Sequence, residues 1–173
     1  LIHTGKRRER NRMATTGAPQ LAQLNAEGMS VAVVVTEWNA GIVDKLRDRA
    51  VTAAGDAGAK VEVFSVAGAL ELPVVVQACA KRYDAVVALG CVIRGETAHF
   101  QYVCDSVTEG LTRVALDEET PVGNGVLTVE EEDQAYERAG GEDAKEDKGA
   151  EAMRAAAGTA AELRKVRALP LKG

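Results

Sequence analysis

The feature that most constrains the fold of this chain is a repeated switch between two hydrophobic periods. Short runs of apolar, mostly β-branched residues, of which residues 31–36 (VAVVVT) are the first, alternate with longer stretches whose apolar residues recur every three or four positions. A continuous apolar run is typical of a strand covered on both faces, and the longer period is typical of an amphipathic helix. We therefore predict strands that alternate with helices.

The positions of these segments predict the topology. We expect strands at residues 31–36, 60–66, 84–93 and 121–129, and helices at about residues 43–54, 73–82, 97–116, 130–138 and 148–169. The second helix is ambiguous, because residues 74–76 favour a strand whereas Pro73 suits the first turn of a helix. Right-handed crossovers leave few alternatives to an α/β fold, a three-layer α/β/α arrangement with a four-stranded parallel sheet of flavodoxin-like topology. We expect each strand to be apolar throughout.

The first 12 residues differ in charge from the rest of the chain. They are strongly basic, although the whole chain of 173 residues has a net charge of −5. The acidic remainder and the aromatic content of 3% argue against a nucleic-acid partner, which needs a basic face and stacking side chains. We predict a basic disordered tail over residues 1–12, or an artefact of cloning or of the start codon, with RNA contact as a weaker alternative. An N-terminal arm over residues 13–27 and a single domain over residues 28–173 would follow.

The remaining composition indicates a cytoplasmic protein without a membrane segment. No apolar run approaches the roughly 20 residues of a membrane-spanning helix. Cys79, Cys91 and Cys104 lie in apolar segments at spacings that suit no metal site, so we expect buried free thiols of a reducing compartment. The chain has no glycine-rich dinucleotide or triphosphate motif, and its two histidines, His3 and His99, form no cluster, so we predict no metal site.

Ligands of parallel α/β sheets bind beyond the carboxyl ends of the strands, so the residues that follow each predicted strand are the candidates. Trp38, the only tryptophan, follows the first strand. It is either an anchor at the edge of the core or a platform that stacks on a planar heterocycle. Glu71 follows the second strand and is either a solvated carboxylate or a ligand-binding group.

The segment after the third strand is the most informative. Gly95, Glu96 and Thr97 precede a predicted helix there. Free backbone N–H groups and the positive end of the helix dipole would favour an anion such as phosphate, although Thr97 is equally explained as an N-cap residue. Histidine is the side chain that titrates nearest neutral pH, so we favour general acid–base chemistry over a surface role for His99.

Six separated blocks together resemble the lumazine synthase family. They are Trp38–Asn39, residues 68–73 (GALELP), residues 88–100 (ALGCVIRGETAHF), residues 121–128 (PVGNGVLT), residues 134–140 (QAYERAG) and residues 147–149 (DKG). They occur in the order of the family at similar spacings, cover about residues 28–168, and are of actinobacterial type. The resemblance implies a transferase of riboflavin biosynthesis that needs no cofactor. It would condense 5-amino-6-(D-ribitylamino)uracil with 3,4-dihydroxy-2-butanone 4-phosphate to 6,7-dimethyl-8-ribityllumazine, phosphate and water.

The resemblance also implies a role for each matching residue. The ribitylaminouracil would contact Trp38, Asn39, Ala69, Leu70, Glu71, Cys91, Val92, Ile93, Asn124 and Lys148. The butanone phosphate would contact Gly95, Glu96, Thr97 and Arg138, and His99 would transfer protons. Asn124 and Lys148 would line the site from a neighbouring subunit or from its edge. The substrate amine is itself the nucleophile, so the route would run through a Schiff base, phosphate elimination and cyclisation.

The resemblance further implies an assembly of identical chains. Family members form pentamers with active sites between subunits, and some extend to hollow shells. The loop over residues 139–147 is slightly longer than in shell-forming members, which favours a homopentamer. The resemblance also implies a functional link to riboflavin synthase. Two residues depart from the common pattern: Asn124 replaces a frequent phenylalanine, and Gln101 replaces a frequent aspartate that would orient His99. The alternatives are a non-catalytic flavin- or lumazine-binding protein and a shell-forming protein with the same pocket.

Overall fold

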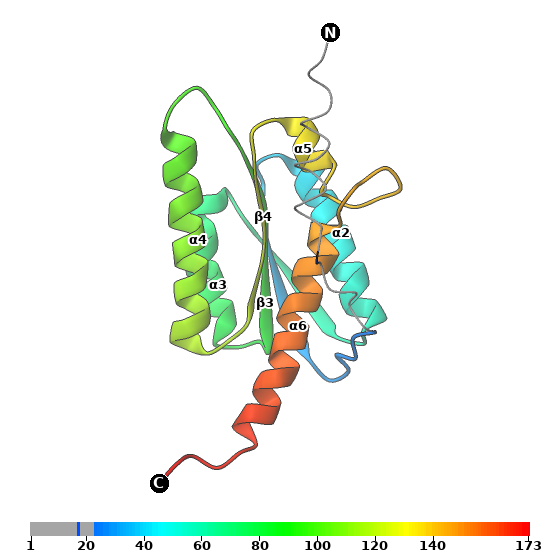
Figure 1. Ribbon diagram of the computed structural model, residues 1–173, viewed down its shortest axis with the longest axis vertical. Coiled ribbons are helices and arrows are strands. Elements are labelled where there is room, and N and C mark those ends of the chain that lie inside the picture. The colour runs from blue at the N-terminus through cyan, green and yellow to red at the C-terminus, as the bar shows by residue number, and fades with distance from the viewer. Residues whose placement is uncertain (1–16, 18–22) are drawn as a thin grey trace.

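The computed structural model describes Gly17 and residues 23–173 (Figure 1). The tail predicted for residues 1–12 and most of the predicted arm lie outside these residues. The described elements are β1 (Ser30–Thr36), α2 (Ala40–Asp56), β2 (Lys60–Val66), the 3-10 turn η1 (Ala69–Glu71), α3 (Leu72–Ala80), β3 (Ala85–Ile93), α4 (His99–Glu118), β4 (Val122–Val129), α5 (Glu132–Tyr136) and α6 (Lys148–Arg167).

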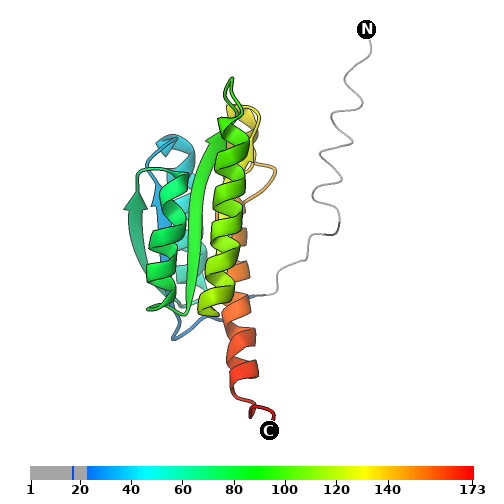
Figure 2. The ribbon, with the colours of Figure 1, turned by 90° about the vertical axis from the view of Figure 1, so that its left-hand side faces the viewer.

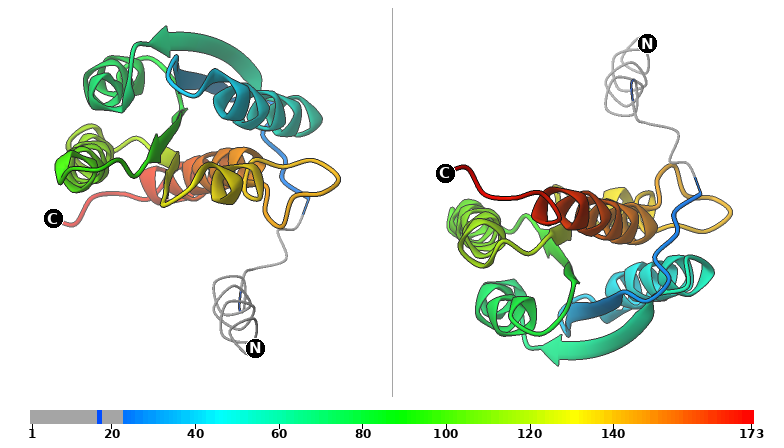
Figure 3. Two further views of the ribbon diagram at one scale, coloured as in Figure 1. Left: turned by 90° about the horizontal axis from the view of Figure 1, so that it is seen from above. Right: turned by 90° about the horizontal axis from the view of Figure 1, so that it is seen from below.

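The four strands form one parallel sheet in the order β2-β1-β3-β4. This is the flavodoxin-like order, and the predicted three-layer α/β/α fold is confirmed. Residues 31–36 of the inner strand β1 are all buried, whereas the edge strand β2 exposes most of its residues, Val63 among them. The expectation that every strand is covered on both faces is wrong for the edge strand β2 and in part for the edge strand β4, whose Asn124 and Thr128 are exposed, because the helices cover mainly the two inner strands (Figure 3).

Helices cover both faces of the sheet, with three described helices on one face and two on the other. Helices α2, α5 and α6 lie on one face, and α3 and α4 lie on the other (Figures 1 and 3). Alternate strand residues point to opposite faces, so each inner strand contributes to two separate cores. Val33 and Leu89 belong to the core under α2 and α6, whereas Val34 and Ala88 belong to the core under α3 and α4.

Small residues allow α6 to approach its neighbours closely. A Cβ atom at Gly149 would overlap the backbone carbonyl of Leu46 in α2, and one at Gly123 would overlap the carbonyl of Ala152 in α6. Glycine is therefore required at both positions by backbone contact. The lower part of α6 extends beyond the sheet in Figures 1 and 2.

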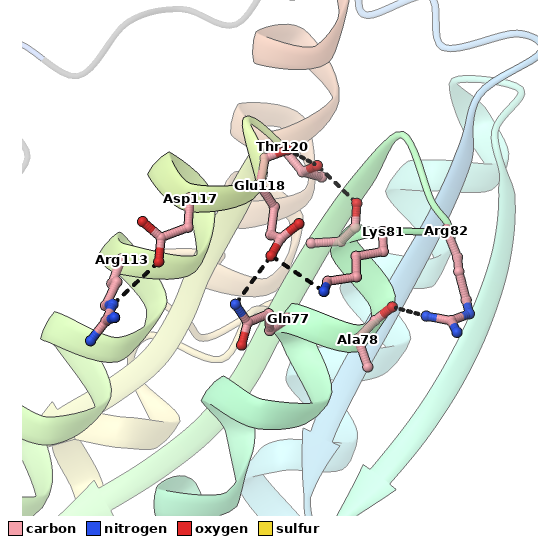
Figure 4. Close-up of polar contacts among 9 residues, drawn as sticks. Gln77, Ala78, Lys81, Arg82, Arg113, Asp117, Glu118 and Thr120 are labelled. Atoms are coloured by element: carbon pink, nitrogen blue, oxygen red, sulfur yellow. Dashed lines mark hydrogen bonds and ion pairs between the residues drawn. The ribbon is translucent and has the colours of Figure 1, made fainter.

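Polar contacts join α3 to the end of α4, at the edge of the sheet where β3 and β4 begin (Figure 4). The buried Thr120 hydroxyl donates to the carbonyl of Ala80 at 2.9 Å, which satisfies an acceptor at the C-terminal end of α3. The Gln77 amide donates to Glu118 Oε1 at 3.1 Å, and Lys81 Nζ lies 3.8 Å from the same oxygen. These contacts fix the two helices at the end of the sheet away from the candidate site.

The predicted boundaries match the strands to within one residue and the helices less closely. The ambiguous segment after Pro73 is helical, as predicted. Helix α4 begins at His99 rather than at Thr97, α5 spans five residues rather than 130–138, and α6 ends at Arg167 rather than at residue 169. None of the helices in the described part of the chain has the length and apolar character that crossing a bilayer requires.

Candidate active site

The candidate residues lie mainly in the loops after the four strands. Because the sheet is parallel, these loops gather at one edge, which is uppermost in Figure 1. The backbone N–H of Glu37 donates to the carbonyl of Val66 at 2.9 Å, and that of Arg94 donates to the carbonyl of Val129 at 2.9 Å. Backbone contacts therefore connect the first loop to the second, and the third to the fourth.

Trp38 forms a cluster with Gly68 and Glu71. Trp38 is 72% exposed in the chain, which argues against an anchor at the edge of the core. A Cβ atom built at Gly68 would lie 3.2 Å from Trp38 Cδ1 and 3.2 Å from Glu71 Oε2, so the ring and the carboxylate flank this glycine. The Gly68 N–H donates to Glu71 Oε2 at 3.0 Å, and the half-buried Ala69 and exposed Leu70 lie in the turn between them. The cluster offers an aromatic face beside a fixed carboxylate, which suits a planar, hydrogen-bonding ligand.

Asn39 ties the Trp38 loop to the end of β3. Its backbone is left-handed, with φ of 56°, a conformation that asparagine tolerates better than most residues. Its side-chain amide donates to the carbonyl of Cys91 at 2.9 Å. The amide predicted to contact substrate is thus engaged within the chain, and it sets the position of the Trp38 cluster relative to Cys91, Val92 and Ile93.

The three cysteines are free thiols, as predicted: Cys79 and Cys91 are buried, and Cys104 is half-buried. Burial, reinforced by the charge of Glu132, raises the pKa of the Cys91 thiol from 9.0 to about 11. Its thiol is therefore neutral near pH 7 and is no nucleophile. Its contribution to this edge is the backbone carbonyl that receives Asn39.

The loop from Arg94 to Ala98 leads into α4 with every residue exposed. The N-cap residue of α4 is Ala98, whose side chain forms no capping hydrogen bond, so the interpretation of Thr97 as the N-cap is wrong. The Thr97 hydroxyl accepts a hydrogen bond from the His99 N–H at 3.4 Å. The Thr97 hydroxyl thus engages one first-turn N–H of this 20-residue helix through a long hydrogen bond, and the N-cap residue Ala98 offers no side-chain acceptor to the others, an arrangement that favours an anion.

Arg138 lies on another side of this edge. It follows α5, and its Nη1 donates to the Gln134 carbonyl at 2.8 Å. Among the described residues, no hydrogen bond or ion pair joins Arg138 to Glu96, Thr97 or His99. The flanking Ala135 and Ala139 belong to the core under α2 and α6, whereas the Glu96 loop leads to α4 on the opposite face. A single chain thus leaves the predicted phosphate contacts apart.

Asn124 and Lys148 also lie away from the Trp38 cluster. Asn124 is exposed in β4, opposite Ala88, and its Oδ1 accepts from the N–H of Val126 at 3.0 Å. Lys148 starts α6, and its Nζ lies 2.9 Å from carboxylates of Glu146 and Glu151. Burial lowers the pKa of Lys148, but the hydrogen bonds to these two carboxylates and their negative charges together outweigh burial and raise it. That both residues line the active site of a neighbouring subunit stays a prediction.

The sequence reasoning gave no role to Arg94, Phe100 and Glu130, which surround the Glu96 loop. The Arg94 guanidinium lies 4.4 Å from the centroid of the Phe100 ring, and its Nε lies 2.5 Å from Glu130 Oε2. Arg94 and Phe100 stand on either side of the Gly95–His99 segment, and this spacing was the signal available in the sequence. Glu130 is 36 positions from Arg94, and no local pattern connects them.

Comparison with known proteins places the chain in one family. Residues 28–164 match the family described as 6,7-dimethyl-8-ribityllumazine synthase. A protein of that name from Corynebacterium efficiens is 62% identical over 156 residues, which cover 90% of this chain and 98% of the relative. Those from Saccharopolyspora erythraea and Mycolicibacterium gilvum are 55% and 53% identical, covering 90% and 89% of this chain and 94% and 98% of the relatives. The chain belongs to the 6,7-dimethyl-8-ribityllumazine synthase family, transferases of riboflavin biosynthesis.

Proposed function

We propose that this chain condenses 5-amino-6-(D-ribitylamino)uracil with 3,4-dihydroxy-2-butanone 4-phosphate to give 6,7-dimethyl-8-ribityllumazine, phosphate and water. The observation that carries this proposal is the meeting of two complementary sites at one sheet edge. The Trp38 cluster offers an aromatic face and a fixed carboxylate for a pyrimidine, and the start of α4, where Ala98 provides no capping side chain, offers N–H groups for a phosphate.

The reaction requires few catalytic groups from the protein. The 5-amino group of the uracil attacks the butanone carbonyl, and loss of water gives a Schiff base. Elimination of phosphate leaves an enol that rearranges to a ketone. The ribitylamino nitrogen attacks this carbonyl, and loss of a second water closes the ring. No serine, cysteine or lysine nucleophile is needed, which suits a site where the Cys91 thiol is buried and neutral.

The assigned roles follow from these steps. Trp38 would stack on the pyrimidine, Glu71 would accept a hydrogen bond from it, and the backbone of residues 91–93 would line the ribityl chain. Gly95, Glu96 and Thr97 would hold the phosphate near the α4 N-terminus, and His99 would move protons between the reacting nitrogens and oxygens. Holding both substrates in a productive geometry can itself supply a large part of the rate, since effective molarities reach about 10⁵ M or more.

A second copy of the chain would complete the site. Arg138, Asn124 and Lys148 do not meet the Trp38 cluster within one chain, and a symmetric neighbour could present them to it. A homopentamer is the assembly we propose, with the cytoplasm as the compartment and riboflavin synthase as the enzyme that uses the product.

Mixing the purified protein with both substrates tests this function directly. We expect lumazine, measured by its absorbance, and inorganic phosphate to form in equal molar amounts. Both should form well above the rate without protein. Folded protein that releases no phosphate above that rate would contradict the proposal. If such protein bound lumazine or flavin tightly, its pocket would bind these molecules without catalysing the reaction.

A further inference from the structure

The loop of residues 94–99 carries the proposed phosphate-binding and proton-transfer residues but has few contacts of its own. All six residues are exposed. Inside the loop, the described side-chain hydrogen bond is the long one, 3.4 Å, from the His99 N–H to the Thr97 hydroxyl. A binding loop must be held by its surroundings if it is to keep one geometry.

Arg94 provides contacts that hold this loop from three sides. Its backbone N–H donates to the carbonyl of Val129, which fixes the start of the loop on the end of β4. Its guanidinium covers the Phe100 ring at 4.4 Å, just past the end of the loop. Its Nε meets the carboxylate of Glu130 at 2.5 Å. The Arg94 side chain therefore spans the loop from its first residue to the residue after His99.

The partners explain why a cation can stay there. A positive charge near a helix N-terminus is disfavoured by the helix dipole. The Glu130 carboxylate and the negative face of the Phe100 ring offset this repulsion. The charge does lie beside the start of α4, because Phe100, whose ring centroid is 4.4 Å from the guanidinium, is in the first turn of this helix.

We propose that Arg94 is a positioning residue for the phosphate-bearing substrate, clamped by Glu130 and Phe100 so that the Gly95–His99 loop keeps its binding shape. This inference rests on the proposed function. Arg94 acts through the loop: its Nε is occupied by Glu130 and one face of its guanidinium by Phe100. The three residues are called the Arg94 clamp below.

The sign of one effect separates this role from direct phosphate binding by Arg94. If the guanidinium itself held the phosphate, removing Glu130 would free the cation and remove a nearby negative charge, so KM for the anionic substrate would fall. If Glu130 holds the clamp, its removal loosens the loop and KM rises. The exposed pair supports a rise of about two- to fivefold.

The experiment measures steady-state kinetics of Glu130→Ala and Phe100→Leu, with Asp133→Ala as the matched control. Asp133 is an exposed acid in α5 whose side chain forms no described hydrogen bond or ion pair. We expect both clamp variants to raise KM for the butanone phosphate, with KM for the ribitylaminouracil and the melting temperature of Glu130→Ala near those of the parent. Asp133→Ala should leave KM for the phosphate substrate unchanged or slightly lower.

The kinetics of Glu130→Ala decide whether the Arg94 clamp holds the loop. An unchanged or lower KM for the phosphate substrate in Glu130→Ala overturns the clamp, even if Phe100→Leu is impaired, because loss of the ring can disturb packing. Equal rises in both KM values would show a general structural defect and also overturn it. If the parent protein forms no lumazine, the proposed function fails and the clamp falls with it, whereas a failure confined to Glu130→Ala leaves the function standing.

Discussion

His99 is an exposed side chain in the first turn of α4, beside the loop proposed to bind phosphate. Replacing it with alanine removes the proposed proton donor and acceptor but no described side-chain contact. We expect kcat to fall by about 10-fold or more, within the range of general acid–base catalysis, and both KM values to change less. Steady-state kinetics of His99→Ala against Ser106→Ala, an exposed position on the same helix, would measure this. A kcat equal to that of the parent would remove His99 from the mechanism.

Replacing Arg138 should weaken the binding of one substrate only, the butanone phosphate. Its guanidinium has free donors, because both described contacts, the hydrogen bond to the carbonyl of Gln134 and a 3.9 Å ion pair with Glu137, engage Nη1. Arg138→Ala should raise KM for the butanone phosphate by about tenfold, as loss of a charge-assisted hydrogen bond predicts, with KM for the uracil little changed. Arg113→Ala, which removes an exposed arginine near the far end of α4, is the control (Figure 4). An unaltered KM would contradict the assigned contact.

Cys91 makes stability depend on pH in the alkaline range. Its pKa is raised to about 11 in the fold from an ordinary value of 9.0, so between these values the unfolded chain releases a proton that the folded chain retains. The free energy of unfolding should therefore fall as pH rises, by about 1 kcal/mol between pH 9 and pH 10. Urea unfolding of the parent and of Cys91→Ala across this range would test the slope. Parallel slopes in the two proteins would show that Cys91 contributes nothing.

At the level of elements, the contact between α2 and α6 depends on Gly149. A Cβ there would overlap the backbone carbonyl of Leu46, and neither backbone can yield without separating the helices. Gly149→Ala should lower the free energy of unfolding by about 1–3 kcal/mol or more. Gly158→Ala is a matched control in the same helix, since a Cβ atom there would have nothing within 4 Å; it should raise stability by about 0.5–1 kcal/mol. Urea denaturation of both variants would show the opposite signs, and equal effects would refute the packing argument.

Local sequence patterns predicted the bounds of all four strands, but they predicted burial well only for the inner strands. The inner strands β1 and β3 are apolar runs and were placed to within one residue. The pattern was less informative for β2, whose Glu62 and exposed Val63 reflect a place at the sheet edge that no local signal specifies. It also placed the start of α4 two residues early, because Thr97 is a typical capping residue, whereas the helix begins at His99, whose N–H the Thr97 hydroxyl accepts from outside the helix.

For the whole molecule, the separation of Arg138, Asn124 and Lys148 from the Trp38 cluster predicts a site shared between chains. Light scattering should give a mass of five times the chain mass of 18.2 kDa. Mixed assemblies of His99→Ala and an Asn124→Ala/Lys148→Ala double variant should regain activity, since about a quarter of their sites would combine two intact halves. Activity equal to the mean of the separate variants would show that each chain holds a complete site.

The sequence by itself determined the α/β class, the parallel sheet and the edge where we propose that the chemistry lies, because hydrophobic period is a local property and the alternation of strands and helices along the chain constrains topology strongly. It also carried the family motifs that single out Trp38 and His99. Only the tertiary structure decided that Asn39 binds the Cys91 carbonyl, that Arg94 is clamped between Glu130 and Phe100, and which chain segments stay apart. The contacts of Asn39 with Cys91 and of Arg94 with Glu130 join residues 52 and 36 positions apart, and they exist only once the sheet has brought the strand ends together.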